Sequence, residues 1–185
     1  MIVYLIRHGQ TQGNLERRYI GSTDEPLCGW GREALAGKSV PPVEKVYTSP
    51  LCRCRETASL LYPQMPQEVI DGLRETDFGA FENHTYDELK DNPAYQTWLN
   101  TAGQTAPPSG ESKADVTRRT LSAFRTIAAK HETNAAIALV VHGGTIMTLL
   151  ETLEEKHEFY RWQVPNGGGF RCSWDGERLR IEEKI

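Results

Sequence analysis

The distribution of apolar residues along the chain predicts a sheet with two central strands. Residues 2–6 form a continuous apolar run rich in β-branched and aromatic side chains, and residues 137–141 form a second such run. Runs of this kind are typical of strands that are covered on both faces of a parallel sheet. Two further short strands are predicted at residues 45–48 and 68–70.

Helical patterns lie between these strands. Ser112 followed by Asp115 is a helix-start signal, and it opens a long predicted helix that continues to about His131. One face of this helix is expected to pack on the sheet, because Val116, Thr120, Phe124, Ile127 and Ala128 recur at helical spacing. The alternation of strands and helices predicts an α/β architecture.

The remaining elements are predicted from caps and turns. Ser49 is expected to cap a helix over residues 51–62, with Pro50 at the first helical position. Shorter helices are expected over residues 32–37 and 144–156. A terminal hairpin is expected over residues 168–174 and 178–183, with its turn at Asp175 and Gly176.

Between residues 71 and 110 the chain is polar and carries scattered aromatic side chains. Asp91-Asn92-Pro93 and Pro107-Pro108-Ser109-Gly110 punctuate one or two small helices in this stretch. We interpret residues 71–110 as a compact insertion that covers the active site. Because no linker, repeat or low-complexity tract divides the chain, we expect a single domain over residues 1–185.

Composition narrows the class of protein. The chain has 185 residues, enough for one domain with its own core, and a formal net charge of −4, so a broad basic face for nucleic acid is not expected. No apolar run approaches the roughly 20 residues of a membrane-spanning helix, and no signal-peptide pattern is present, so we expect no membrane partner and a cytoplasmic location. The four cysteines are therefore expected to be reduced. They are Cys28, Cys52, Cys54 and Cys172.

Two histidines follow the predicted central strands in the same local pattern. His8 and His142 each come directly after a strand and directly before glycine, in His8-Gly9 and His142-Gly143-Gly144. Since the carboxyl ends of parallel strands meet at one edge of a sheet, both imidazoles are expected to be neighbours there. Gly143 and Gly144 open a helix, whose free N–H groups would suit an anion. A lone histidine at a strand end would be interpreted as structural, but the repeated pattern favours a functional pair.

The other histidines, His84, His131 and His157, lack this pattern and are expected to be solvated. None of the five histidines belongs to a His-x-x-x-His motif, and Cys52-x-Cys54 alone is a weak sign of a metal. We therefore predict no metal and no cofactor.

Arg53 lies in the first turn of the helix that Ser49 is expected to cap, where the helix dipole and the guanidinium group both favour an anion. Together with Arg7, it would place two guanidinium groups near the strand ends. Arg55 is the natural control. From spacing alone, a role for Arg53 in anion binding and a place among the exposed helix arginines are equally supported.

Short motifs then continue in order along the chain. They are Leu5-Ile6-Arg7-His8-Gly9-Gln10-Thr11 with Asn14, Tyr19-Ile20-Gly21, Asp24 with Pro26-Leu27, Thr48-Ser49-Pro50-Leu51-x-Arg53 with Thr57-Ala58, Leu73-x-Glu75 with Phe78-Gly79, Gly110-Glu111-Ser112, and Val141-His142-Gly143-Gly144. As an ordered set they resemble the histidine phosphatase superfamily, which includes cofactor-dependent phosphoglycerate mutases and α-ribazole phosphatases. The resemblance implies a three-layer phosphoglycerate mutase-like fold with a mostly parallel sheet.

The resemblance also implies residue roles. The residue that matches His8 attacks phosphorus and becomes a phosphohistidine, while the residues that match Arg7, Arg53 and His142 bind the phosphate and stabilise its charge. Glu75 matches the family's general acid. Secondary substrate contacts would come from Asn14, Thr11, Gly21 and the backbone of Gly143.

Several departures leave the substrate open. Glu82-Asn83 stands where many members have Glu-Gly, and Cys28 stands where Thr or Ser often caps the next helix. On charge alone, Asp77 and Glu82 compete with Glu75 for the role of the acid, and either could assist it.

The resemblance leaves more than one function. The compact segment 71–110 favours a hydrolase of a small phosphorylated metabolite, with α-ribazole 5′-phosphate as the first substrate to test. Trp98 and Tyr95 could flank a cyclic group, although aromatic residues at this spacing more often serve packing. The alternatives are phosphoglycerate mutase-type phosphoryl transfer and a catalytically silent relative that binds a phospho-ligand or a partner. The pattern is compatible with a monomer or a homodimer.

Overall fold

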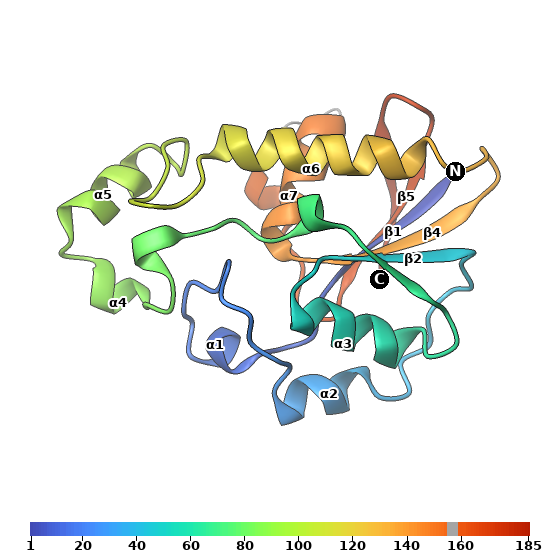
Figure 1. The fold of residues 1–185 in the computed structure, drawn as a ribbon, viewed down its shortest axis with the longest axis horizontal. Helices are drawn as coiled ribbons and strands as arrows, with labels where there is room; N and C mark the ends of the chain where they lie inside the picture. The colour runs from blue at the N-terminus through green and yellow to red at the C-terminus, as the bar shows by residue number, and fades with distance from the viewer. Residues whose placement is uncertain (155–158) are drawn as a thin grey trace.

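The computed structural model describes residues 1–154 and 159–185, and a six-stranded mixed sheet lies at its centre (Figure 1). The strand order is β3-β2-β4-β1-β5-β6. The first four strands pair in parallel, whereas the pairs β1–β5 and β5–β6 are antiparallel. The predicted mostly parallel sheet is confirmed, with β1 and β4 as adjacent central strands. The strands are β1 (Ile2–Arg7), β2 (Lys45–Thr48), β3 (Gln67–Val69), β4 (Ala136–Val141), β5 (Gly169–Trp174) and β6 (Leu179–Lys184).

Helices cover both faces of this sheet, which gives three layers (Figure 1). The longer helices are α2 (Gly29–Leu35), α3 (Cys52–Leu61), α5 (Pro93–Asn100), α6 (Lys113–Ala128) and α7 (Gly143–Leu153). The short elements are α1 (Gln12–Leu15), α4 (Tyr86–Leu89), and the 3-10 turns η1 (Asp71–Leu73), η2 (Gly79–Phe81) and η3 (Phe159–Trp162).

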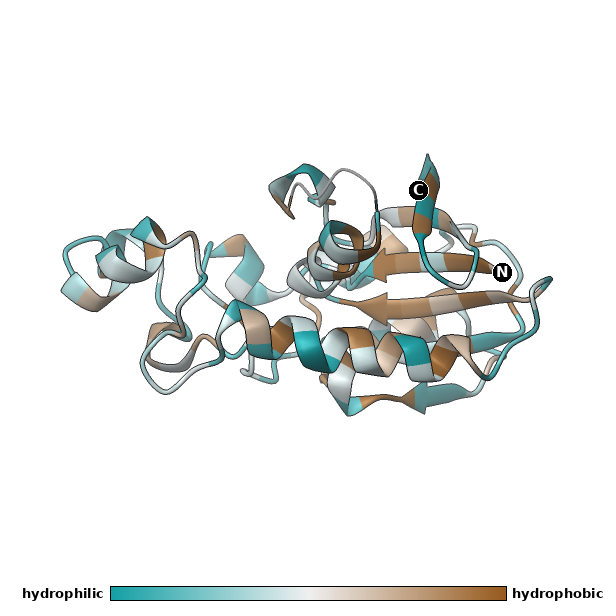
Figure 2. Cartoon of the chain, turned by 90° about the horizontal axis from the view of Figure 1, so that it is seen from above, coloured by the Kyte–Doolittle hydropathy of each residue, from teal (hydrophilic) through white to brown (hydrophobic). Residues whose placement is uncertain are grey.

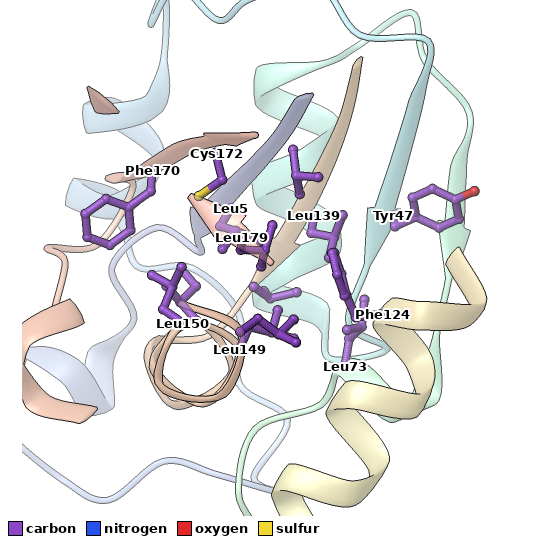
Figure 3. Close-up of a cluster of buried hydrophobic side chains, with 14 of the residues drawn as sticks. Leu5, Tyr47, Leu73, Phe124, Leu139, Leu149, Leu150, Phe170, Cys172 and Leu179 are labelled. Carbon is purple, nitrogen blue, oxygen red and sulfur yellow. The ribbon is translucent and has the colours of Figure 1, made fainter. Parts of the chain in front are cut away.

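Each face of the sheet has its own apolar core. On one face, Leu5 and Leu139 pack with Phe124 of α6 and Leu149 of α7 (Figure 3). On the other face, Ile6 of β1 packs with residues of β2, β4, α2 and α3. Figure 2 shows that the central strands are largely hydrophobic, whereas the long helix α6 alternates between hydrophobic and hydrophilic residues. The period-3.6 pattern of α6 therefore turns its apolar stripe toward the sheet.

The long helix begins as the sequence predicts. The Ser112 side chain accepts a hydrogen bond from the backbone N–H of Asp115, and the Asp115 side chain accepts one from the Ser112 backbone. This capping box satisfies two N–H groups that a helix start otherwise leaves unpaired. Four residues of the predicted apolar face are buried: Val116, Thr120, Phe124 and Ile127.

The segment of residues 71–110 extends away from the sheet and carries η1, η2, α4 and α5 (Figure 1). It has a separate small core, here called the aromatic cluster. Its buried members are Phe81, Leu89 and Tyr95, with Tyr19, Phe78 and Trp98 packed against them. Tyr95 is fully buried, so its packing interpretation is confirmed.

Several sequence-based boundaries and environments are wrong. α2 starts three residues earlier than predicted, because the Cys28 side chain accepts the Gly31 N–H as a helix cap. His131 is not solvated: its ring contacts the Tyr47 hydroxyl at 2.8 Å and also Glu44. α7 ends at Leu153, because the backbone of Glu154 is extended, so the predicted helix is too long. Residues 155 and 156 of the predicted helix and the solvation of His157 lie outside the described residues.

All four cysteines are free thiols, and Cys54 and Cys172 are buried. Within the described parts of the chain, no helix has both the length and the apolar character needed to span a membrane.

Candidate active site

The carboxyl ends of the two central strands bring the two candidate histidines together. Arg7 at the end of β1 pairs with Val141 at the end of β4, so His8 and His142 leave the sheet side by side. The His8 N–H donates to Val141 O at 2.9 Å, and the two imidazole centroids lie 5.2 Å apart. The neighbouring histidines predicted from the repeated pattern are confirmed by this geometry.

The hydrogen bonds of the His8 ring fix which nitrogen carries the proton. His8 Nδ1 lies 2.7 Å from the carbonyl oxygen of Gly9. Because a carbonyl oxygen only accepts hydrogen bonds, Nδ1 is the donor, and the neutral ring keeps its lone pair on Nε2. The ring is 4% exposed. A buried imidazole with a free Nε2 lone pair is a potential nucleophile.

Two guanidinium groups surround this ring. Arg53 is fully buried, unlike its exposed neighbour Arg55, and it donates to Thr23 O at 2.7 Å and Gly21 O at 2.9 Å. Arg7 donates to Val164 O at 2.8 Å. The buried Nε atoms of Arg7 and Arg53 have no hydrogen-bond partner within the described structure. Since an unpaired buried donor is costly, both guanidinium groups are suited to an anionic ligand.

Burial and positive charge keep both imidazoles neutral. Desolvation, followed by the charge of Arg53, lowers the pKa of His8 well below its ordinary value of 6.5, and Arg7 adds to the effect. Desolvation and Arg53 also lower the pKa of His142 well below 6.5. The pKa shifts follow from the cost of burying a cation next to other cations.

The hydroxyl of Ser49 contacts His142 and does not cap α3 as predicted. Ser49 Oγ lies 2.7 Å from His142 Nε2, and it accepts the Leu51 N–H before the helix begins. The N-terminus of α3 is instead capped from a distant loop, since Asp24 accepts the Cys52 N–H at 2.6 Å. Ser49 differs from the prediction because the buried His142 imidazole needs a polar partner. Asp24 replaces Ser49 as the acceptor at the N-terminus of α3.

Glu75 lies at the N-terminus of α7, beside the histidine pair. Its Oε2 accepts the Gly144 N–H at 2.9 Å, and its Oε1 accepts the Thr76 N–H at 2.9 Å. A side chain at Gly144 would lie 2.3 Å from Glu75 Oε1, so the second glycine after His142 makes room for this carboxyl group. The N–H of Gly144 is therefore occupied by Glu75, contrary to the expectation that it is free for an anion.

The two competing carboxylates have structural partners. Glu82 accepts hydrogen bonds from the backbone N–H groups of Gly21, Ser22 and Phe78, and from the Thr23 hydroxyl. Burial alone would raise the pKa of Glu82, but these hydrogen bonds hold it below its usual value. Asp77 accepts the Gly79 N–H at 2.8 Å. Both carboxylates thus tie loops together, and neither resembles Glu75 in its place beside α7.

The backbone explains the departure at Asn83. Its φ angle is +62°, in the left-handed region that favours glycine and that asparagine tolerates better than most residues. The Glu82-Asn83 pair therefore keeps the turn that a Glu-Gly pair would form.

A cavity of about 660 Å³ opens beside Arg7 and Glu75. Arg7, Asn14, Glu75, Gly143 and Gly144 line one part of it, and Trp98 lines another part. Segment 71–110 thus contributes to the cavity wall, as its interpretation as a cover requires.

The predicted secondary contacts divide into two groups. Asn14 and Gly143 line the cavity, as a substrate contact requires. Thr11 is fully buried, and its hydroxyl caps α1 by accepting the Asn14 N–H. Gly21 offers its carbonyl to Arg53, and a side chain at this position would lie 1.9 Å from Thr76 O. Thr11 and Gly21 therefore hold the loops in position through these contacts.

Two residues near the site, Asn166 and Arg119, are not predicted from the sequence. Asn166 donates to Asn14 Oδ1 at 2.9 Å and to His8 O at 3.2 Å. Arg119 donates to both carboxylate oxygens of Glu111 and to Glu75 O at 2.9 Å, which fixes the loop that carries Glu75. Asn166 lies in the Pro-Asn-Gly turn before β5, and no spacing from His8 in the sequence indicates their contact.

Among the residues that the structure describes, no group of three or more His, Cys, Asp or Glu side chains is arranged to hold a metal ion. Metal-independent chemistry stays a prediction that requires an experiment.

The sequence and the fold are those of a known family. The sequence profile of the histidine phosphatase superfamily (branch 1) matches residues 3–184, and the chain belongs to this superfamily. Its α/β architecture is the phosphoglycerate mutase-like fold, which also matches a solved structure of a putative α-ribazole-5′-P phosphatase from Escherichia coli with a TM-score of 0.86 at 24% identity. The coverage is 98% of this chain and 94% of that one.

Relatives with different names are similar to this chain. Bifunctional protein Rv2228c of Mycobacterium tuberculosis is 35% identical over 155 residues, which are 79% of this chain but only 42% of that protein. The phosphoglycerate mutase structure from Thermus thermophilus is 31% identical, with a TM-score of 0.76, and covers 100% of this chain and 98% of its own. The α-ribazole phosphatase structure from Shigella flexneri is 25% identical, with a TM-score of 0.84, and covers 98% and 95%.

Proposed function

We propose that this protein is a phosphomonoesterase that hydrolyses a small phosphorylated metabolite through a phosphohistidine at His8. The main support for this proposal is the tautomer of the His8 ring, in which Nδ1 donates to Gly9 O and Nε2 keeps its lone pair. Next to it, Arg7 and Arg53 each keep a buried Nε–H without a protein partner in the described structure. A phosphate dianion supplies acceptors for such donors, and its phosphorus is an electrophile for Nε2.

The reaction would proceed in two displacements. In the first, the Nε2 lone pair attacks phosphorus, and the P–O bond to the alcohol breaks with its electron pair. Arg7, Arg53 and His142 would stabilise the negative charge on the phosphoryl oxygens. In the second, water attacks phosphorus, and the N–P bond breaks to regenerate the neutral imidazole. Dividing one difficult displacement into two lowers each barrier.

Glu75 would act as the general acid and base. Protonated Glu75 would give its proton to the leaving alkoxide oxygen in the first step. The resulting carboxylate would take a proton from the attacking water in the second step. The contact of Glu75 with Gly144 supports this role, because it holds the carboxyl group next to the loop of His142.

Hydrolysis is favoured over phosphoryl transfer between phosphoglycerates. Both activities use a phosphohistidine, and they differ in whether water or a second phosphorylated acceptor reaches it. Segment 71–110 is compact, and most of the cavity wall that it supplies comes from α5 and the turn after it. Similarity to an α-ribazole phosphatase makes α-ribazole 5′-phosphate the first substrate to test. The free thiols are compatible with the proposed cytoplasmic location.

A catalytically silent phosphate-binding relative is the alternative of another class. Its discriminating feature would be loss of a charged or nucleophilic position, whereas His8, Arg7, Arg53, His142 and Glu75 are all present. A phospho-ligand would then bind without release of phosphate.

The experiment is a screen of phosphorylated metabolites and p-nitrophenyl phosphate in the presence of a metal chelator. Release of inorganic phosphate and interconversion of 2- and 3-phosphoglycerate are measured together, with a bisphosphate primer. We expect metal-independent phosphate release that is lost in His8→Ala and retained in Arg55→Ala. Faster primer-dependent isomerisation than phosphate release would favour the mutase, and unchanged turnover by His8→Ala would refute the proposed function.

A further inference from the structure

The cavity is much larger than a phosphate group needs. Its volume is about 660 Å³. Cavities of ~300–1,000 Å³ typically enclose ligands with several rings or comparable bulk. If the phosphate lies against Arg7 and Gly143, most of the volume is left for the leaving group.

The far part of the cavity has an aromatic wall that is held in place. Trp98 lines the cavity together with Tyr19 and Phe78. The Trp98 ring lies edge-to-face with Tyr19 at 5.7 Å and stacks on the buried Tyr95 at 5.8 Å. Gly103, at a φ angle of +73°, lies beside the indole, and a side chain there would come within 3.6 Å of it. The aromatic cluster thus presents one fixed indole to the cavity.

Other parts of the wall are also apolar. Val116 of α6 and Met147 of α7 line the same cavity. Methionine packs well against aromatic rings because its thioether is flexible and polarisable. A flat ring between such side chains would lose little conformational entropy on binding.

Charge argues against an anionic leaving group. Besides Arg7, the described cations that line the cavity are Arg18 and Lys113. Arg18 pairs with Glu16 at 2.7 Å and with Glu88 at 3.0 Å. Lys113 pairs with Glu151 at 2.7 Å. A carboxylate or a second phosphate on the leaving group would have to compete with these ion pairs.

We propose that the cavity is a subsite for a neutral, ring-bearing alcohol, and that Trp98 determines specificity by contacting this ring. The inference rests on the proposed phosphatase function, because it assigns the cavity to the leaving group of the same ester. It directs the search for the substrate toward phosphate esters whose alcohol carries an aromatic or heteroaromatic ring, and away from phosphorylated carboxylic acids.

Two phosphonates that differ in their apolar group test binding at the subsite separately from hydrolysis. 2-Phenylethyl phosphonate and n-butyl phosphonate cannot be hydrolysed, and their affinities are measured by calorimetry. We expect the phenyl compound to bind about tenfold more tightly to the wild type. The same preference should appear in kcat/KM for the two phosphate esters, which have similar leaving groups.

Variants test whether the preference for the phenyl compound comes from the Trp98 indole. In Trp98→Ala the affinity ratio should approach one, and in Trp98→Phe most of the preference should return. Trp30→Ala, which removes a 72% exposed tryptophan of α2, should leave the ratio unchanged. Equal affinities in the wild type, or an equal loss for both phosphonates in folded Trp98→Ala, would overturn the subsite. Binding preference without phosphate release would instead refute only the proposed phosphatase function.

A second inference comes from the hydrogen bonds of Asn166. One N–H of its Nδ2 is shared between His8 O at 3.2 Å and Gly9 O at 3.4 Å, and Gly9 O is also the acceptor of His8 Nδ1–H. The same amide donates to Asn14 Oδ1 at 2.9 Å. We infer that Asn166 is a positioning residue that holds the Gly9 carbonyl, and through it the His8 tautomer with Nε2 free.

The test of this role is a measurement of the His8 tautomer. Nitrogen-15 NMR of the imidazoles should show His8 protonated at Nδ1 in the wild type and a mixture of tautomers in Asn166→Ala. The variant should lose roughly tenfold in kcat with little change in KM. Lys38→Ala removes a contact to Gly167 in the same turn and is the control, expected to leave the His8 signals unchanged. An unchanged His8 tautomer in folded Asn166→Ala would refute this role.

Discussion

Two regions of this molecule differ in how they are held. The proposed phosphate end lies at the carboxyl ends of the central strands and the start of α3, where His142 and Arg53 are fully buried. Its side chains are held by backbone carbonyls such as Gly9 O and Thr23 O. The proposed leaving-group end depends on the aromatic cluster, a small core of its own outside the sheet. In this proposal, phosphoryl chemistry and leaving-group recognition rest on separate packing units, which substitutions should perturb separately.

The largest expected effect is a loss of hydrolysis rate at the proposed phosphate end, in Glu75→Gln. Loss of a general acid lowers the rate by ~10²–10⁴ when the leaving group is a poor one. We expect a loss in this range for an alkyl phosphate, and a much smaller loss for p-nitrophenyl phosphate, whose phenolate leaves without protonation. Steady-state kinetics with both esters measures the difference.

Asp77→Asn is the matched control, because Asp77 belongs to the same loop but caps Gly79. It should change the two rates by similar, small factors. If Glu75→Gln slowed both esters equally, Glu75 would not be the proton donor.

The two cores should respond differently to truncation. Phe124→Ala removes a buried ring from the sheet core and should lower the global free energy of unfolding by about 3–5 kcal/mol. Phe81→Ala removes a buried ring from the aromatic cluster, so its main effect should be local. Hydrogen exchange should increase within segment 71–110 and stay slow in β1 and β4.

Kinetics complete this comparison. Phe81→Ala should raise KM for a ring-bearing ester through loss of support for Trp98, while the His8 site stays assembled. Equal loss of protection in the sheet and in segment 71–110 would show that they form one cooperative unit.

The smallest expected effect concerns pH. The pKa values of His8 and His142 lie well below 6.5 in the folded state, whereas the unfolded histidines take up protons near 6.5. Below that pH the unfolded state binds more protons, so the free energy of unfolding falls with decreasing pH, by at most about 1.4 kcal/mol per pH unit for each histidine.

Urea unfolding at pH 7.5 and pH 5.5 measures this dependence. The difference between the two pH values should be smaller in His8→Gln than in the wild type. His84→Gln, at an exposed histidine, is the control and should keep the wild-type difference. A wild-type difference in His8→Gln would contradict neutral burial of His8.

The sequence predicts those parts of the fold that follow from local patterns. The buried strands and the capping box of Ser112 depend on residues close together in the chain. The shared edge of His8 and His142 follows from the same local pattern at the ends of two parallel strands. The bonds of Ser49 to His142 and of Asp24 to Cys52 could not be predicted, because they join segments distant in sequence. The resemblance to a family selected Arg53 over Arg55, and the structure shows that Arg53 is buried whereas Arg55 is exposed.

The central claim is that His8 accepts the phosphoryl group, and rapid quenching of the enzyme during turnover tests it most directly. Alkaline digestion and mass spectrometry of the quenched protein should find an acid-labile phosphate on the peptide that carries His8. The adduct should form and decay at rates compatible with turnover. Turnover with no phosphate on His8 at any quench time, or with phosphate on another residue, would contradict the account.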